Sequence, residues 1–336
     1  MATLPKIDYQ AVPKEYLDFI DRMKGKIQKW YDSGEMGKGK TKIKVCDECK
    51  LIFRFLLQKD YLKKIMLLEA YELPLLIILV EEKFPVLKDE REGKLASHSD
   101  LYQCLMKAFY SLGYCDTQFP DYEITKALGL EACPYCNAED LIAQDLVEEG
   151  VKIRNSELDH FFPKDLHPYL AISLYNLVPS GQICNGAACK HNKDSFEKDL
   201  VNPFDLPDSE GFLFKLKIDD KGIASYNTFE QSCKIETYIM DSSLKVNASM
   251  FKIAARYALE WKQVRMVWYL HKKCSAEGYR KEMERISRTM NETLTFDTWF
   301  ELEMGIVPSD YNKRKLSKLS MDIWRQLEGM RTVNVI

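Results

Sequence analysis

The sequence predicts a mainly α-helical protein with a short module of a different kind in its middle, so the overall class is α+β. Three observations support this expectation. Apolar residues recur at helical spacing over long stretches on both sides of the middle. Residues 129–205 instead hold three of the five histidines and four of the ten cysteines, among Pro, Asn and short alternating segments. Residues 212–239 alternate apolar and polar side chains, which is typical of a strand pair.

The composition limits the function classes. The 336 residues suffice for one large domain or two modest ones, and 46% hydrophobic with 29% charged residues excludes global disorder. The formal net charge of −3 requires any nucleic-acid contact to come from a local basic patch. The longest apolar run, Leu75 to Val80, is far shorter than the ~20 residues of a membrane-spanning helix. The first residues lack the pattern of a signal peptide, so we expect a cytoplasmic protein with no membrane partner.

Residues 1–128 are expected to form an irregular helical region. Pro13 suits the first turn of its opening helix, in which Leu17, Ile20, Ile27 and Trp30 recur at helical spacing. Pro74 and the charged stretch 88–94 separate the helices that follow. The predicted helices span residues 14–31, 47–72 and 99–113.

Two short motifs in this region have familiar patterns. Gly34 to Thr41 matches the phosphate-loop pattern GxxxxGK[ST], but no buried strand precedes it, so a flexible basic linker is the preferred interpretation. Cys46-Asp-Glu-Cys49 has no second cysteine pair nearby in the sequence, and we expect it to open the following helix.

Residues 206–336 are expected to form a β-hairpin followed by helices. The turn of the hairpin is predicted at residues 219–222. A long helix is predicted over residues 248–274, with Trp261 and Trp268 on its buried stripe and Gly278 as its stop. A last helix is predicted from about residue 313 to residue 327.

The middle segment carries the chemistry. Cys133 and Cys136 form a CxxC knuckle whose thiolates can share a tetrahedral metal, and Cys184 and Cys189 are the candidate second pair. In a reducing compartment such cysteines are metal ligands, catalytic groups or core thiols more often than disulfides. The sequence therefore predicts a structural zinc, with buried thiols as the alternative.

Between the cysteine pairs lie the parts of a one-metal phosphodiester-cleaving site. A neutral imidazole such as that of His160 can take a proton from water near pH 7. A carboxylate such as that of Asp159, with an amide or imidazole from a later helix, can hold Mg²⁺ or Mn²⁺. Asn176 can fix the loop that carries the base through hydrogen bonds to the backbone.

These motifs together resemble the HNH endonucleases, whose ββα-metal (His-Me finger) fold surrounds one divalent ion and is often stapled by zinc. The resemblance covers about residues 129–205 and rests on four motifs in the order of the family. It implies that His160 is the general base, Asp159 a metal ligand and Asn176 the residue that orients the loop. The matching segments are Cys133-Pro-Tyr-Cys136, Leu158-Asp-His-Phe-Phe-Pro-Lys164, Tyr175-Asn-Leu-Val-Pro-Ser180 and Cys184-Asn185.

The resemblance leaves two assignments open. The third residue of the family pattern is Asn185 in one alignment and His191 or Asn192 in another, with His191 slightly preferred because imidazole is the better ligand. Gly181 stands where many members have a cysteine, so the zinc would use Cys189 or be three-coordinate or absent.

The predicted function is metal-dependent hydrolysis of DNA by an endonuclease, of the kind found in bacterial defence against phage or foreign DNA. Such nucleases often act with a separate ATPase or sensor protein. The alternative is a non-catalytic, zinc-stapled module that binds nucleic acid or a partner. A basic cluster after residue 260 is a candidate phosphate-binding surface or a solvated helix face: Lys262, Arg265, Lys272, Lys273, Arg280, Lys281, Arg285 and Arg288. His167 is expected at the surface or against substrate.

Overall fold

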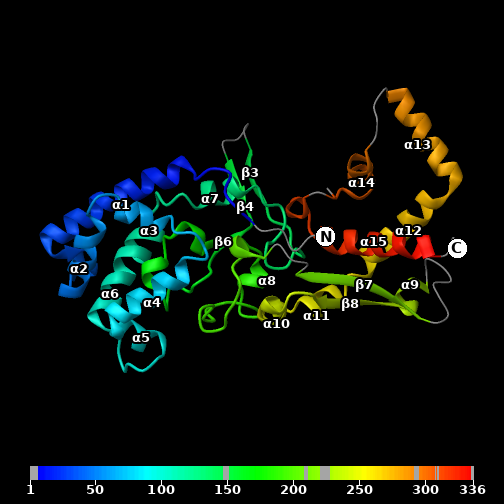
Figure 1. The fold of residues 1–336 in the computed structure, drawn as a ribbon. Coiled ribbons are helices and arrows are strands. Elements are labelled where there is room, and N and C mark those ends of the chain that lie inside the picture. Colours follow the sequence, from blue (N-terminus) through cyan, green and yellow to red (C-terminus); the bar gives the residue numbers. More distant parts are fainter. Residues whose placement is uncertain are drawn as a thin grey trace. The chain divides into compact units, whose positions relative to one another are not determined.

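The computed structural model describes residues 7–146, 151–207, 211–219, 228–290, 295–306, 308 and 310–333. The described residues form two compact units (Figure 1). The N-terminal unit comprises Ile7–Gly129 and Ala143–Asp205, and the C-terminal unit comprises Leu130–Ile142 and the described part of Leu206–Ile336. The division into segments 1–128, 129–205 and 206–336 remains a prediction from the sequence.

The N-terminal unit is built mainly from helices. The first predicted helix is confirmed as α1, which buries Phe19, Met23 and Ile27 and ends at Gly34, where a φ of 70° suits a residue without a Cβ. The helices of this unit are α1 (Lys14–Ser33), α2 (Asp47–Leu56), α3 (Tyr61–Met66), α4 (Leu73–Lys83), α5 (Pro85–Arg91), α6 (Asp100–Leu105), the π-helix η2 (Met106–Tyr114) and α7 (Asp121–Leu128).

Several predicted boundaries in this unit are wrong. The helix expected over 47–72 is interrupted after α2, where Lys59 takes a left-handed backbone conformation with a φ of 46°. Pro74 lies in the first turn of α4, a position where its missing N–H costs no helical hydrogen bond.

The segment that matches the phosphate-loop pattern forms a small hairpin of β1 (Glu35–Met36) and β2 (Ile43–Lys44) around the short helix η1 (Gly39–Thr41). This hairpin lacks the strand–loop–helix geometry that a phosphate-binding loop requires.

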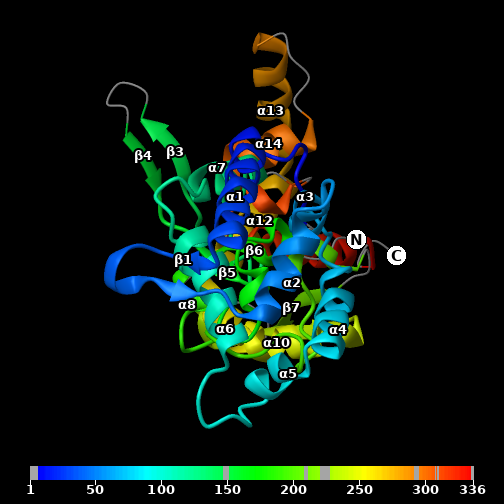
Figure 2. The same ribbon diagram turned by 90° about the vertical axis from the view of Figure 1, so that its left-hand side faces the viewer.

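Two antiparallel hairpins complete the N-terminal unit. The hairpin of β3 (Ala143–Leu146) and β4 (Val151–Arg154) lies beside α7, to which Lys152 and Arg154 are joined by ion pairs (Figure 2). The hairpin of β5 (Glu157–His160) and β6 (Leu177–Ser180) is followed by the short helix α8 (Gln182–Asn185). All four residues of β6 are buried, which makes this second hairpin part of the core.

The C-terminal unit is organised around a longer hairpin. The predicted strand pair is confirmed as β7 (Phe212–Ile218) and β8 (Cys233–Ile239), while the predicted turn falls largely outside the described residues. Phe212, Phe214 and Leu216 point inward, and α15 packs along β7 (Figure 1). The helices of this unit are α9 (Phe229–Ser232), α10 (Lys245–Met250), α11 (Ile253–Tyr257), α12 (Trp261–Ser275), α13 (Glu277–Met290), α14 (Phe296–Met304) and α15 (Ser317–Val333).

The single long helix predicted over 248–274 is wrong. The chain there forms α10, α11 and α12 with two breaks, and Lys252 precedes α11 with a left-handed φ of 52°. Trp268 is buried as expected, so the periodic pattern identified a buried face but not its interruptions. Gly278 lies inside α13 and does not stop a helix. Among the described residues, no helix has the length and apolar character that crossing a membrane requires.

Candidate active site and metal-binding cysteines

Three of the residues that the sequence singled out as catalytic, Asp159, His160 and Asn176, lie at the β5–β6 hairpin. Asp159 and His160 are the last two residues of β5 and pair with Val178 and Leu177 of β6. Because neighbouring side chains of a strand point to opposite faces, Asp159 and His160 face different surroundings. Asp159 is buried, whereas His160 remains partly exposed.

Asn176 lies directly before β6 and holds the loop that follows His160. Its side-chain oxygen accepts the N–H of Phe162 at 2.7 Å. Its amide nitrogen donates to the carbonyl of Phe162 at 3.1 Å and to that of Leu170 at 3.0 Å. The fully buried side chain therefore ties together both ends of the loop 162–170, using three hydrogen bonds that an apolar replacement could not make.

The His160 imidazole is oriented by a backbone carbonyl. Its Nε2 lies 3.0 Å from the oxygen of Ala171, and because a carbonyl can only accept, Nε2 carries the proton. Nδ1 is then the basic nitrogen of the neutral ring. Burial lowers the pKa of His160 to about 4, although the Asp159 carboxylate opposes this change. The Tyr114 ring packs edge-on against the imidazole, with 4.6 Å between ring centroids.

Asp159 is held by a buried lysine that the sequence analysis did not identify. The Lys190 ammonium lies 3.0 Å from Oδ1 of Asp159 and also donates to the carbonyl of His160 at 2.8 Å. Lys190 has no exposed surface, so its charge depends on these oxygens. Lys190 follows Cys189 with no helical or strand pattern around it, so no sequence signal indicated this pairing.

The alternatives for the third residue of the pattern lie at the surface or are engaged elsewhere. His191 is exposed and takes a left-handed φ of 45°. Asn192 donates to Asp165 at 2.8 Å, and Asn185 of α8 donates to Glu157 at 2.7 Å. Glu157 is two residues before Asp159 and shares its face of β5, which places Asn185 on the Asp159 side of the hairpin.

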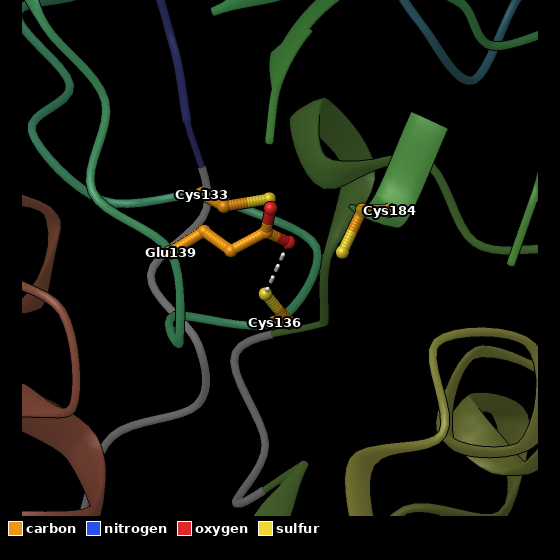
Figure 3. A group of neighbouring side chains, drawn as sticks. All are labelled: Cys133, Cys136, Glu139 and Cys184. Atoms are coloured by element: carbon orange, nitrogen blue, oxygen red, sulfur yellow. Dashed lines mark hydrogen bonds between the residues drawn. The ribbon is translucent and has the colours of Figure 1, made fainter. Parts of the chain in front are cut away.

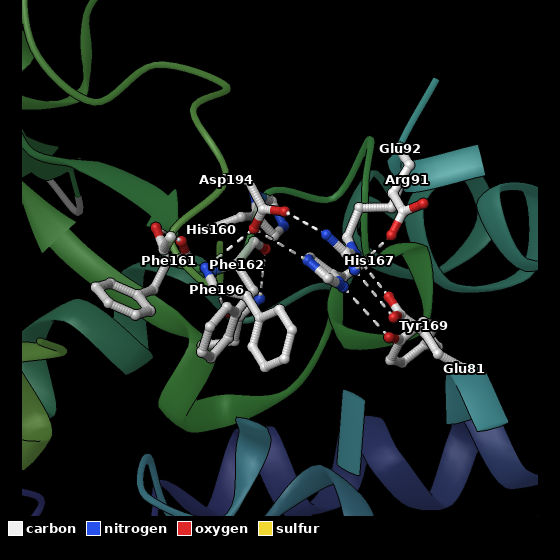
Figure 4. Close-up of polar contacts among 12 residues, drawn as sticks. Glu81, Arg91, Glu92, His160, Phe161, Phe162, His167, Tyr169, Asp194 and Phe196 are labelled. Carbon is white, nitrogen blue, oxygen red and sulfur yellow. Dashed lines mark hydrogen bonds and ion pairs between the residues drawn. The ribbon is translucent and has the colours of Figure 1, made fainter. Parts of the chain in front are cut away.

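His167 differs from expectation because it is fully buried. Its Nδ1 lies 3.2 Å from the hydroxyl of Tyr169, and its Nε2 lies 3.4 Å from Asp194 (Figure 4). Arg91 binds the other oxygen of Asp194 at 3.3 Å and forms a bidentate pair with Glu81, with atoms 2.7 and 3.1 Å apart. The prediction of a surface position was wrong, because His167 belongs to a buried polar network that joins α4 and α5 to the loop after β5.

The C-terminal unit holds the first cysteine pair in a compact turn. The sulfurs of Cys133 and Cys136 and a carboxylate oxygen of Glu139 all lie within 4.8 Å of one another, so these donors could hold a metal such as zinc (Figure 3, which also labels Cys184 of the other unit). The N–H of Ala138 donates to the Cys136 sulfur at 3.3 Å, and the Cys136 thiol donates to a carboxylate oxygen of Glu139 at 3.8 Å (Figure 3). Glu139 was missed because a single carboxylate after a CxxC pair is common in any sequence.

The rest of the C-terminal unit fixes this turn in place. Tyr257 donates to the carbonyl of Cys136 at 2.5 Å, and Arg256 pairs with Glu139 at 2.9 Å. Asn137, with a left-handed φ of 52°, donates to the carbonyl of Tyr311 at 2.7 Å. In the N-terminal unit, Cys184 and Cys189 are both buried, and the N–H of Lys190 donates to the carbonyl of Cys184.

Ion pairs with other described residues engage three of the eight residues of the predicted basic cluster. Lys273 of α12 binds Glu303 at 3.2 Å. On α13, Lys281 pairs with Glu277 and Arg285 pairs with Glu282. Lys272 is exposed and stacks over the Trp268 ring at 4.2 Å from its centroid. For the three paired residues, this arrangement favours a solvated helix face.

Comparison with known proteins gives one partial similarity. A stretch of 99 residues is 31% identical to Septu protein PtuB of Bacillus thuringiensis. The match spans 29% of this chain and 34% of that protein. No protein-family model matches the sequence, and no solved structure matches the chain.

Proposed function

We propose that the N-terminal unit hydrolyses phosphodiester bonds of DNA as an HNH-type endonuclease, with His160 as the general base. The observation that carries this proposal is the orientation of His160: its Nε2 proton is held by the Ala171 carbonyl, which leaves Nδ1 as a basic nitrogen. The lowered pKa of His160 keeps the imidazole neutral near pH 7, the form that accepts a proton from water.

The remaining contacts support a positioned base. Asn176 binds the carbonyls of Phe162 and Leu170, at the two ends of the loop 162–170. Leu170 directly precedes Ala171, so the carbonyl that orients His160 follows a restrained segment. Tyr114 covers one side of the ring and limits its rotation. General-base catalysis needs this restraint because the proton acceptor must stay within hydrogen-bond reach of the attacking water.

A divalent ion, Mg²⁺ or Mn²⁺, would supply Lewis-acid chemistry at the scissile phosphate. Of the expected ligands, Asp159, Asn192 and Asn185 do not fit this role, because other side chains already engage them. The Lys190 ammonium already neutralises Asp159, and both asparagine amides donate to other carboxylates. The requirement for a divalent ion is therefore proposed from the sequence motifs alone.

We also propose a structural zinc on Cys133 and Cys136, as the sequence predicts, with its other ligands drawn from Glu139, Cys184 and Cys189. Thiolates are the donors that zinc prefers, and a structural zinc contributes folding free energy. Freshly purified Cys133→Ser protein should contain about one zinc less per chain and melt at a lower temperature. Parallel Glu139→Gln, Cys184→Ser and Cys189→Ser variants would identify the other ligands.

The biological setting of the proposal is bacterial defence. The partial similarity to a Septu protein supports this setting, because Septu is a bacterial defence system. Septu proteins work in multi-protein systems, so a separate partner such as an ATPase or sensor protein fits the proposal.

A plasmid-nicking assay tests the proposed activity. The wild-type chain should nick plasmid DNA in Mg²⁺ or Mn²⁺, lose this activity in EDTA, and lose it on His160→Ala. The alternative function is a non-catalytic module that shifts DNA or a partner with or without divalent ions. Unchanged nicking by His160→Ala would reject the general-base assignment, and binding without any nicking would favour the module.

A further inference from the structure

An apolar groove of about 520 Å³ lies in the N-terminal unit, and none of the candidate catalytic residues lines it. Helices α2, α3 and α4 contribute its walls (Figure 1). Leu105 of α6 and Phe109 of η2, which are both buried, lie at its bottom. The longest apolar run of the sequence, Leu75 to Val80, belongs to α4 and supplies part of one wall. The groove thus gives this run a setting that the sequence alone did not indicate.

The walls of the groove expose large apolar side chains. Leu51 and Phe55 of α2 are 56% and 48% exposed, and Leu79 of α4 is 62% exposed. Contiguous apolar surface of this kind marks interaction sites in soluble proteins, because leaving it in water is unfavourable. Since the walls themselves face solvent, the groove has the character of a docking surface and not of an enclosed ligand cavity.

Helix α4 is apolar on more faces than the unit buries. Leu73 and Ile77, one turn apart, are buried in the unit. Leu76, Leu79 and Val80 occupy another face at the i, i+3, i+4 spacing of a helical stripe, and they line the groove. A helix that is apolar on several faces is normally covered on each of them. The apolar stripe of another helix matches such a wall in shape and chemistry.

Three cations border the groove. Lys83 is exposed and is the one charged side chain among the described residues that line it. Arg54 lies one turn after the lining residue Leu51 on α2, and Lys64 directly precedes the lining residue Ile65 on α3; both are exposed. Within the part of the chain that the structure describes, these three cations form no ion pair. A partner surface that complements them carries carboxylates.

We propose that this groove binds an amphipathic helix of a partner protein. The apolar stripe of that helix fills the groove, and its acidic side chains pair with Arg54, Lys64 and Lys83. This inference is independent of the proposed nuclease activity.

Two other occupants fit the groove less well. In a two-fold contact of the groove with that of a second copy, the same cations would face one another and repel. A membrane surface would meet the exposed wall residues but not the apolar side chains at the bottom, because these are recessed between the helices. A helix has the narrow convex shape that reaches both.

Peptide titration tests the inference on the full chain. The probe is a fluorescently labelled peptide of about 20 residues, long enough to form a helix, with leucines at i, i+3, i+4 and i+7 and glutamates on both sides of this stripe. A second peptide has lysines in place of the glutamates, and a third has the composition of the first with its leucines spread around the helix. Fluorescence anisotropy should show binding of the first peptide, at least about tenfold weaker binding of the second because like charges repel, and no binding of the third.

Matched variants locate the binding surface. Leu79→Glu and Leu51→Glu should each weaken binding of the glutamate peptide by at least about tenfold, because each places a charge in the apolar groove. Leu259→Glu, at a residue 75% exposed in the C-terminal unit, should leave the affinity unchanged. Lys83→Glu should narrow the affinity difference between the glutamate and lysine peptides, whereas Glu82→Gln, at an exposed neighbour that does not line the groove, should not. Melting temperatures measured in parallel identify variants that fail to fold.

Several results would overturn the proposal. One is the absence of binding of the glutamate peptide below ~1 mM, and another is equal binding of the third peptide. Light scattering that shows dimers of the wild-type chain and monomers of Leu79→Glu would assign the groove to a second copy instead. Sedimentation of the wild-type chain, but not of Leu79→Glu, with vesicles of phosphatidylglycerol and phosphatidylcholine would assign it to a membrane surface. None of these measurements uses plasmid nicking, so failure of the proposed nuclease activity would not affect them.

Discussion

The chemistry of the candidate site depends first on single side chains, and His160 is the most directly testable. His160→Ala should lower the nicking rate by ~10²–10⁴-fold, because the imidazole is the proton acceptor in the proposed mechanism. Binding of DNA and the melting temperature should change little, since the ring is partly exposed and makes one hydrogen bond. His98→Ala, which changes an exposed histidine paired with Glu90, is a matched control. A rate within tenfold of wild type would reject the assignment.

Lys190 is the second residue whose substitution should have a measurable effect, in this case on stability. Lys190→Met should lower the free energy of unfolding by ~3–5 kcal/mol, because it leaves the Asp159 carboxylate buried without its positive partner. The measurement is the urea midpoint, with exposed Lys198→Met as the control. The double variant Asp159→Asn with Lys190→Met should recover much of the loss. If the single and double variants were equally unstable, the buried ion pair would not be the cause.

At the scale of elements, the network around Arg91 joins helices α4 and α5 to the loop after β5. Burial raises the pKa of Asp194. The interactions with His167, the Phe196 amide and Arg91 together lower it by more, so the net pKa of Asp194 is below its ordinary value. A lowered carboxyl pKa contributes stability above the unfolded value of about 3.9, and this contribution is lost as the pH falls through the folded value.

Asp194→Asn should therefore destabilise the protein by ~3 kcal/mol near pH 7, and the difference from wild type should shrink as the pH falls below about 4. Urea midpoints measured between pH 7 and pH 3.5 check this. Glu197→Gln, three residues away and exposed, should show no such pH-dependent difference. A constant difference at all pH values would mean that Asp194 acts through packing and not through its charge.

The helices and strands differ in how well the sequence predicts their positions and their buried contacts. The alternation of Phe212, Phe214 and Leu216 located β7, because strand periodicity is a local property. The breaks at Lys59 and Lys252 were missed, since left-handed backbone at a lysine leaves no pattern in the sequence. Burial of His167 and Lys190 was missed for a related reason: their partners Asp194 and Asp159 lie 27 and 31 residues away, and only the fold brings them together.

At the scale of the whole molecule, the net charge of −3 leaves open which surface meets DNA. Ion pairs already engage Lys273, Lys281 and Arg285 of the basic cluster, and His167 and Lys190 are buried. We consider one lysine of each unit as a candidate phosphate contact. Lys272 is exposed over Trp268 in the C-terminal unit. Lys164 lies 4.8 Å from the Tyr110 ring centroid in the N-terminal unit, near His160, and pairs with the adjacent Asp165 at 3.0 Å.

We expect Lys164→Ala to weaken binding to all DNA sequences alike, because a phosphate contact carries no sequence information. Each lost phosphate contact should reduce the slope of log affinity against log salt by about 0.9. The double variant Lys272→Ala with Lys273→Ala should lower the slope by no more than one contact, because Lys273 is already paired with Glu303. Binding isotherms at several salt concentrations measure both effects. An unchanged slope in Lys164→Ala together with a reduction in the double variant would place the DNA contacts in the C-terminal unit, and α12 would then have a binding role beyond its buried face.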